Sequence, residues 1–143
     1  MFMSFFKGKE RKPNPNQSVK TWKITSECFS MISESAKSMF PKEFGGLLRC
    51  DDEKRDIITE IVLLPGTIAG DSHAIFRMHM KPFDLSLVGT VHSHPSRSYH
   101  PSDADIQLFR KYGKIHIIIA SPYTTESWQG YDQKGEPVTV HII

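Results

Sequence analysis

The stretch from residue 87 to residue 105 reads LVGTVHSHPSRSYHPSDAD, and it joins a strand pattern to the beginning of a helix. Residues 87–93 are apolar and β-branched enough to predict a buried strand. Pro95 would end that strand, and Pro101 followed by Ser102 is typical of the start of a helix, expected over residues 102–112. The stretch therefore predicts a strand and a helix connected by a short loop.

Side chains that suit a metal ion stand at both ends of this loop. His92 and His94 are two apart at the strand end, so their imidazoles point to the same side of the strand. Asp105 falls in the first helical turn, where Ser102-x-x-Asp105 resembles a capping box and the helix dipole keeps the carboxylate ionised. A His-x-His pair among seven histidines, or a Ser-x-x-Asp cap, would be unremarkable alone. Together, at this spacing, they favour a metal site over coincidence.

The donor set indicates which metal is expected. Zinc accepts two neutral imidazoles and one carboxylate, and it then keeps its fourth position open for water, as catalytic zinc sites do. A structural zinc would take four protein ligands, usually including cysteine, and Cys28 and Cys50 are both remote from this motif in sequence. His92, His94 and Asp105 are therefore predicted to be the ligands of a catalytic zinc ion.

Outside the motif, strand patterns predominate. Further strands are predicted over residues 19–24, 44–50, 56–64, 73–78, 115–120, 126–131 and 138–143. Residues 115–120 (IHIIIA) are nearly continuously apolar, which predicts a strand at the sheet centre with both faces covered. A helix is expected from a cap at Thr25 or Ser26 to Pro41, with an apolar and a polar face. The apolar face is Phe29, Ile32, Ala36, Met39 and Phe40, and the polar face is Ser33, Glu34, Lys37 and Ser38. These elements predict the α/β class, with one mixed sheet covered by helices.

Composition limits the remaining possibilities. The 143 residues favour one domain, expected over residues 19–143 after a flexible basic segment, 1–18. The net charge of +2 offers no electrostatic reason to expect nucleic acid or membrane as a partner. No apolar run approaches the roughly 20 residues of a membrane span, so a soluble, cytoplasmic protein is expected. Cys28 and Cys50 are expected to be buried and reduced, with a single disulfide as the alternative.

The motif residues resemble a known family. His92-Ser93-His94-Pro95, followed by Ser102-Asp103-Ala104-Asp105, matches the His-x-His-x7-Ser-x2-Asp pattern of the JAMM motif in the MPN+/JAB zinc metalloproteases, prokaryotic single-domain type. Residues 41–48 (PKEFGGLL) are similar to the family element that carries a glutamate before a glycine-containing strand. The resemblance covers about residues 19–125, and it implies the MPN (cytidine-deaminase-like) layered fold.

The resemblance also implies catalytic roles and a substrate class. It assigns Glu43 as the proton-transferring base, although Glu27, Glu34 and Glu60 are equally open from the residues alone. It assigns the Ser102 hydroxyl to oxyanion stabilisation and one Zn²⁺ to each molecule. Relatives cleave isopeptide or peptide bonds at the C-terminus of ubiquitin-like modifier proteins. Residues 66–80 would suit pairing with an extended modifier tail as an added strand.

Four other functions compete with this one. The domain could be a non-catalytic MPN scaffold, or it could process ubiquitin-like sulfur-carrier precursors. A RadC-like role near DNA is disfavoured because no basic patch surrounds the motif. A zinc nucleoside deaminase would need a Pro-Cys-x-x-Cys element, which is missing from the sequence. The oligomeric state, the particular modifier and any activating partner stay open.

Overall fold

The computed structural model describes residues 21–63 and 84–143. Seven strands and two helices lie in these ranges. In sequence order they are β1 (Thr21–Ile24), α1 (Ser26–Met39), β2 (Gly45–Cys50), β3 (Ile57–Leu63), β4 (Leu87–His94), α3 (Asp103–Lys111), β5 (Ile115–Ala120), β6 (Trp128–Tyr131) and β7 (Pro137–Ile142). Predictions for residues 1–20 and 64–83, including the basic segment over 1–18, the strand over 73–78 and the modifier-pairing segment over 66–80, lie outside the described residues.

The strands form one mixed sheet in the order β1-β3-β2-β4-β5-β6-β7. The β1/β3, β1/β7 and β4/β5 pairs are parallel, and the other neighbouring pairs are antiparallel. The predicted mixed sheet is thus confirmed. Its closure is a feature that the sequence did not predict, because β1 also pairs with β7 and joins the two ends of the sheet into a barrel.

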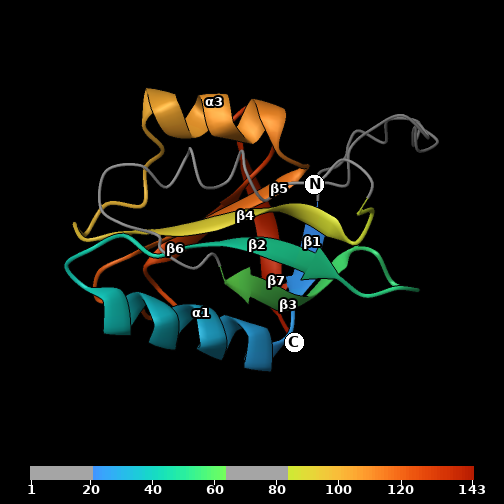
Figure 1. Ribbon diagram of the computed structural model, residues 1–143, viewed down its shortest axis with the longest axis horizontal. Helices are drawn as coiled ribbons and strands as arrows, with labels where there is room; N and C mark the ends of the chain where they lie inside the picture. The colour runs from blue at the N-terminus through green and yellow to red at the C-terminus, as the bar shows by residue number, and fades with distance from the viewer. Residues whose placement is uncertain (1–20, 64–83) are drawn as a thin grey trace, which may run out of the picture.

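The two helices cover opposite faces of this sheet, as Figure 1 shows with α1 below and α3 above the strands. Successive side chains of β5 point to opposite faces of the sheet. Ile115, Ile117 and Ile119 belong to the core cluster that contains residues of α1, whereas Ile118 belongs to the cluster that contains residues of α3. Every residue of β5 is buried. The prediction that this strand is covered on both faces is therefore confirmed.

Helix α1 follows its predicted pattern with two exceptions. Thr25 caps the helix, since its hydroxyl accepts a hydrogen bond from the Cys28 N–H at 3.2 Å. Ser33, predicted on the polar face, is buried, and its hydroxyl donates to the Tyr123 carbonyl at 2.6 Å. Phe40, predicted on the apolar face, is 53% exposed, because it follows the last helical residue and its non-helical backbone turns it away from the buried stripe.

Most element ends agree with the predicted bounds to within a residue. Strand β6 begins two residues later than predicted, since the Ser127 N–H and hydroxyl both donate to the Thr124 carbonyl of the preceding turn. Both cysteines are buried and free, which confirms the expected thiols. Burial raises the pKa of the Cys28 thiol to about 12. Among the described residues, no helix is long and apolar enough to cross a membrane.

Strand β4, which carries both motif histidines, lies directly against β5 near Gly89. Gly89 is the register partner of Ile115, and a Cβ atom added at Gly89 would overlap the Ile115 carbonyl. The segment that follows α3 also approaches here, where the Lys114 N–H donates to the Val88 carbonyl at 2.7 Å. Glycine at position 89 therefore permits the close β4/β5 contact that places the histidines.

We expect Gly89→Ala to lower the free energy of unfolding by about 3 kcal/mol or more, because the overlap is with backbone and forces the strands apart. Chemical denaturation would measure this loss. Gly46→Ala is the matched control: its added Cβ would lie 3.1 Å from the nearest atom, the Val62 carbonyl oxygen, so its effect should be much smaller. Equal stabilities of the Gly89→Ala variant and the wild type would contradict this account of the β4/β5 contact.

Candidate metal centre

The three predicted ligand side chains meet at one point between β4 and α3. His92 Nε2 lies 3.1 Å from Asp105 Oδ1, and His94 Nε2 lies 3.2 Å from Asp105 Oδ2. One ligand atom from each residue lies within 4.8 Å of the others. His92 and Asp105 are buried, whereas His94 is partly open to solvent. β4 pairs with β2 on one side and with β5 on the other, so the cluster sits at the C-terminal end of a fully paired strand.

These separations fit a small divalent ion. Ligands about 2.0–2.2 Å from a tetrahedral zinc are about 3.3 Å from each other. His92 Nε2 and His94 Nε2 lie at a comparable spacing, 3.1 and 3.2 Å, from Oδ1 and Oδ2 of Asp105 respectively, so the carboxylate faces both imidazoles through different oxygens. The donor set of two imidazoles and a carboxylate also matches what zinc accepts when one position stays open. The residues present therefore fit a catalytic-type zinc site.

The hydrogen bonding of His94 gives a second indication of a cation. His94 Nδ1 lies 2.9 Å from the Ser98 carbonyl oxygen, which only accepts, so Nδ1 carries a hydrogen. In the neutral ring, the Nε2 lone pair then faces the Asp105 carboxylate. Two electron-rich atoms at 3.2 Å repel each other unless a proton or a metal ion lies between them. A second hydrogen bond that fixes the ring in this way is typical of metal-ligating histidines.

Local structure at the start of α3 holds Asp105 in place. Ser102 is the N-cap, and its hydroxyl accepts from the Asp105 N–H at 3.1 Å. The Ser102 N–H donates in return to Asp105 Oδ2 at 2.9 Å, which completes the predicted capping box. The carboxylate is thus fixed by the backbone before any metal binds, which lowers the ordering cost of ligation.

Glu43 lies in the turn between α1 and β2, beside the histidine strand. The Phe44 N–H donates to Ser93 Oγ at 2.8 Å, and the Ser93 N–H donates to the Phe44 carbonyl at 2.9 Å. Glu43 therefore directly precedes Phe44, and Phe44 is hydrogen-bonded to Ser93, the residue between His92 and His94. Burial lowers the pKa of His94, but hydrogen bonds to Asp105 and Ser98 and the charges of Asp105 and Glu43 outweigh it, so that pKa is raised. Glu43 is thus close enough to act electrostatically on the centre.

The other described histidines are not members of this cluster. His100 and His141 are exposed. His116 is fully buried: its Nδ1 accepts from the Thr90 hydroxyl at 2.7 Å, and its Nε2 donates to the Gly113 carbonyl at 3.1 Å. Its ring stacks on Phe109 with centroids 4.4 Å apart. His116 is therefore a packed, neutral histidine beneath α3 and takes no part in the metal centre.

Burial lowers the pKa of His116 from its ordinary value of 6.5 to about 3. His116 therefore binds a proton less readily in the folded protein than in the unfolded chain. Its contribution to the free energy of unfolding is complete above pH 6.5 and is lost as the pH falls towards 3. We expect the unfolding free energy of the metal-free wild type to fall more steeply below pH 6.5 than that of His116→Gln, by up to about 1.4 kcal/mol per pH unit. Denaturant titrations of both proteins between pH 7 and pH 4.5 would test this, and parallel pH profiles would contradict it.

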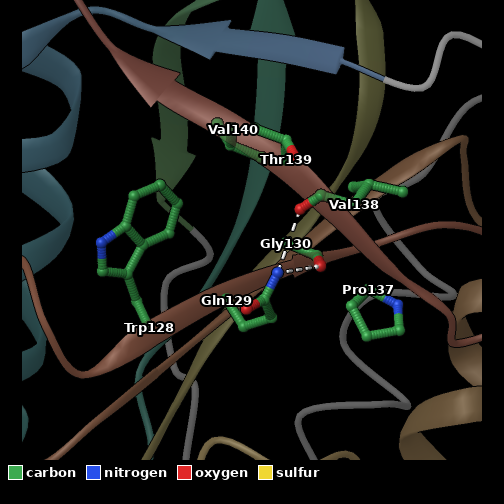
Figure 2. Close-up of a pocket in the computed structure, with 7 residues that line it drawn as sticks. All are labelled: Trp128, Gln129, Gly130, Pro137, Val138, Thr139 and Val140. Atoms are coloured by element: carbon green, nitrogen blue, oxygen red, sulfur yellow. Dashed lines mark hydrogen bonds between the residues drawn. The ribbon is translucent and has the colours of Figure 1, made fainter. Parts of the chain in front are cut away.

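A separate pocket of about 380 Å³ lies on β6 and β7 (Figure 2). It is lined by Trp128, Gln129, Gly130, Pro137, Val138, Thr139 and Val140. None of these residues is a metal-ligand type, and the Gln129 amide already donates to the Gly130 and Val138 carbonyls at 3.1 and 3.0 Å. The pocket is therefore distinct from the metal centre, and its main polar group is satisfied within the protein.

A helix-covered mixed sheet that presents this His–His–Asp cluster defines a JAB1/MPN domain of the JAMM metalloprotease type. Residues 25–131 match the family described as prokaryotic homologs of the JAB domain. The protein belongs to that family, and the fold class implied by its sequence is confirmed.

Individual relatives agree with this assignment. The protein is 35% identical over 127 residues to a probable metalloprotease of Haloferax volcanii, covering 84% of its own length and 78% of the relative. It is similar to the crystal structure of a JAB1/MPN domain protein from Archaeoglobus fulgidus, with a TM-score of 0.68, 37% identity, and coverage of 85% and 98% of the two proteins. A structure described as JAMM, a metalloprotease-like zinc site in the proteasome and signalosome, matches with a TM-score of 0.68, 36% identity, and coverage of 86% and 98%.

Proposed function

We propose that this protein is a zinc-dependent protease that cleaves the peptide or isopeptide bond at the C-terminus of a ubiquitin-like protein. The observation that carries the proposal is the buried Asp105 carboxylate, which lies 3.1 and 3.2 Å from the Nε2 atoms of His92 and His94. Family membership supports hydrolysis as the use of this centre, and the relative from Haloferax volcanii is named a probable metalloprotease. The ubiquitin-like substrate rests on the family resemblance alone.

Each proposed residue has a distinct task. His92, His94 and Asp105 would hold one zinc ion, which supplies a water of lowered pKa and polarises the scissile carbonyl. Glu43 would take the proton from the attacking water and deliver it to the departing amine. The Ser102 hydroxyl would donate to the developing oxyanion, in addition to its observed task of capping α3. A Ser102 substitution therefore alters both catalysis and the position of Asp105.

A test needs both metal content and cleavage. We expect the purified protein to contain about one zinc per molecule and to release a ubiquitin-like protein from a linear fusion or a lysine-linked conjugate. Chelation should abolish the release, and added zinc should restore it. Comparing the linear and lysine-linked substrates would separate precursor processing from isopeptide cleavage. A protein that binds no zinc, or that binds zinc but cleaves neither substrate, would favour a scaffold and contradict the proposal.

A further inference from the structure

The loop over residues 95–101 sets the spacing between two of the proposed ligands. It begins directly after His94 and ends just before Ser102, which caps the helix that carries Asp105. A shift of the loop would therefore change how His94 and Asp105 face each other. The loop also supplies the Ser98 carbonyl that fixes the His94 ring. Whatever holds this loop consequently holds the metal centre.

One anchor of the loop comes from a residue that is distant in sequence. The Tyr131 hydroxyl, at the end of β6, donates to the Tyr99 carbonyl at 2.6 Å. This is a short hydrogen bond that joins a sheet strand to the middle of the loop. The bond is to the backbone carbonyl of Tyr99, and the side chain of Tyr99 is exposed.

Tyr131 is itself rigidly placed. Its side chain is buried with 3% exposure, and its ring lies nearly parallel to that of Phe109, with centroids 5.8 Å apart and planes at 21°. Phe109 in turn stacks on His116 and lies 6.5 Å from the His92 ring. Tyr131, Phe109 and His116 thus form a stack that orients the Tyr131 hydroxyl, and its middle ring, Phe109, is also a neighbour of the His92 ring.

A phenylalanine would fill the same space, so the hydroxyl requires its own explanation. Burying a hydroxyl is unfavourable unless it forms a hydrogen bond, and here that bond goes to the loop between the ligands. Burial and the neighbouring charges of Tyr99 and Asp105 raise the pKa of Tyr131 to about 12. The phenol therefore stays a neutral hydrogen-bond donor at neutral pH.

We propose that Tyr131 is a positioning residue for the metal centre, which holds His94 and Asp105 at their binding separation through the Tyr99 carbonyl. This inference rests on the proposed function, because it assumes that the His–His–Asp cluster binds zinc. Tyr131 touches neither metal nor substrate in this role. Its effect passes through the loop, so it should alter metal affinity and coordination geometry more than global stability.

The test compares Tyr131→Phe with the wild type in zinc affinity, measured by competition with a chromophoric chelator. We expect Tyr131→Phe to bind zinc roughly tenfold more weakly than the wild type. Substituting the residues that position metal ligands typically lowers metal affinity by about 10–100-fold, and this value is the lower end of that range. The visible absorption bands of the Co²⁺-substituted protein should also shift or weaken, because the ligand geometry is less well held. Tyr112→Phe removes a hydroxyl at the opposite end of α3, and Tyr99→Ala keeps the acceptor carbonyl, so both should resemble the wild type.

The possible outcomes are distinguishable. Wild-type zinc affinity and an unchanged Co²⁺ spectrum in Tyr131→Phe would overturn the positioning role, even if the melting temperature fell, and would leave the proposed protease intact. A wild-type protein that binds no zinc would overturn both. Weaker zinc binding in Tyr131→Phe together with an equal loss in Tyr112→Phe would indicate a general packing effect and would also contradict the inference.

Discussion

Glu43→Gln should retain zinc and lose nearly all proteolytic turnover. Glutamine keeps the size of the side chain but removes the carboxylate that accepts a proton, and general acid–base groups contribute about 10²–10⁴ in rate. We therefore expect kcat to fall by roughly that factor. Zinc content should stay at the wild-type level, because Glu43 is not among the three residues that converge at the centre. Metal analysis and steady-state cleavage assays on the same preparations would measure both quantities.

The controls for this experiment are two of the three other glutamates that the sequence alone left open. Glu34 is exposed on α1 and pairs with Lys37, and Glu60 is exposed on β3 beside Arg49. Replacing either residue by glutamine removes one negative charge, as Glu43→Gln does. Glu34→Gln and Glu60→Gln should cleave at the wild-type rate. Near-wild-type turnover in Glu43→Gln would remove Glu43 from the mechanism, and loss of zinc in that variant would instead make it part of the metal site.

Long-range structure is the reason why Glu43 could be chosen as the base only through the family pattern. Strand periodicity gives His92 and His94 a common direction, and helix capping fixes Asp105, so the local placement of each ligand follows from interactions within a few residues. Glu43 lies beside the histidine strand only because β2 pairs with β4, where Gly45 and His92 are register partners although they are 47 residues apart. Periodicity and capping patterns do not specify which strands pair. The same limitation applies to Tyr131, which meets the loop from β6.

Long-range pairing also explains where the fold departs from the prediction. Strand positions follow the apolar patterns closely, but closure depends on β1 lying between β3 and β7, which no local pattern encodes. The polar hydroxyl of Ser33 predicts a solvent-facing position. The Tyr123 carbonyl, 90 residues away, provides the acceptor that allows this hydroxyl to be buried. Both differences come from partners that only the assembled structure supplies.

Asp105→Asn should abolish zinc binding while leaving the fold intact. Asparagine has nearly the same shape, and its side-chain oxygen can still accept from the Ser102 N–H, so the α3 cap is retained. The negative charge between the two histidines is lost, and a neutral amide is a poor ligand for zinc. We expect the loss of affinity to exceed the roughly 10–100-fold that changes around metal ligands cause. Isothermal titration with zinc would measure it.

Thermal unfolding provides an independent measure of the same loss, and Asp103→Asn provides its control. A ligand that binds only the folded state stabilises it by about 2.7 kcal/mol at a hundred times its Kd. Zinc should therefore raise the melting temperature of the wild type and of Asp103→Asn, which removes the same charge from an exposed position in the same helical turn. Zinc should leave the melting temperature of Asp105→Asn unchanged. A zinc-induced shift of equal size in Asp105→Asn would show that the metal binds elsewhere, and the geometry of His92, His94 and Asp105 would then need another explanation.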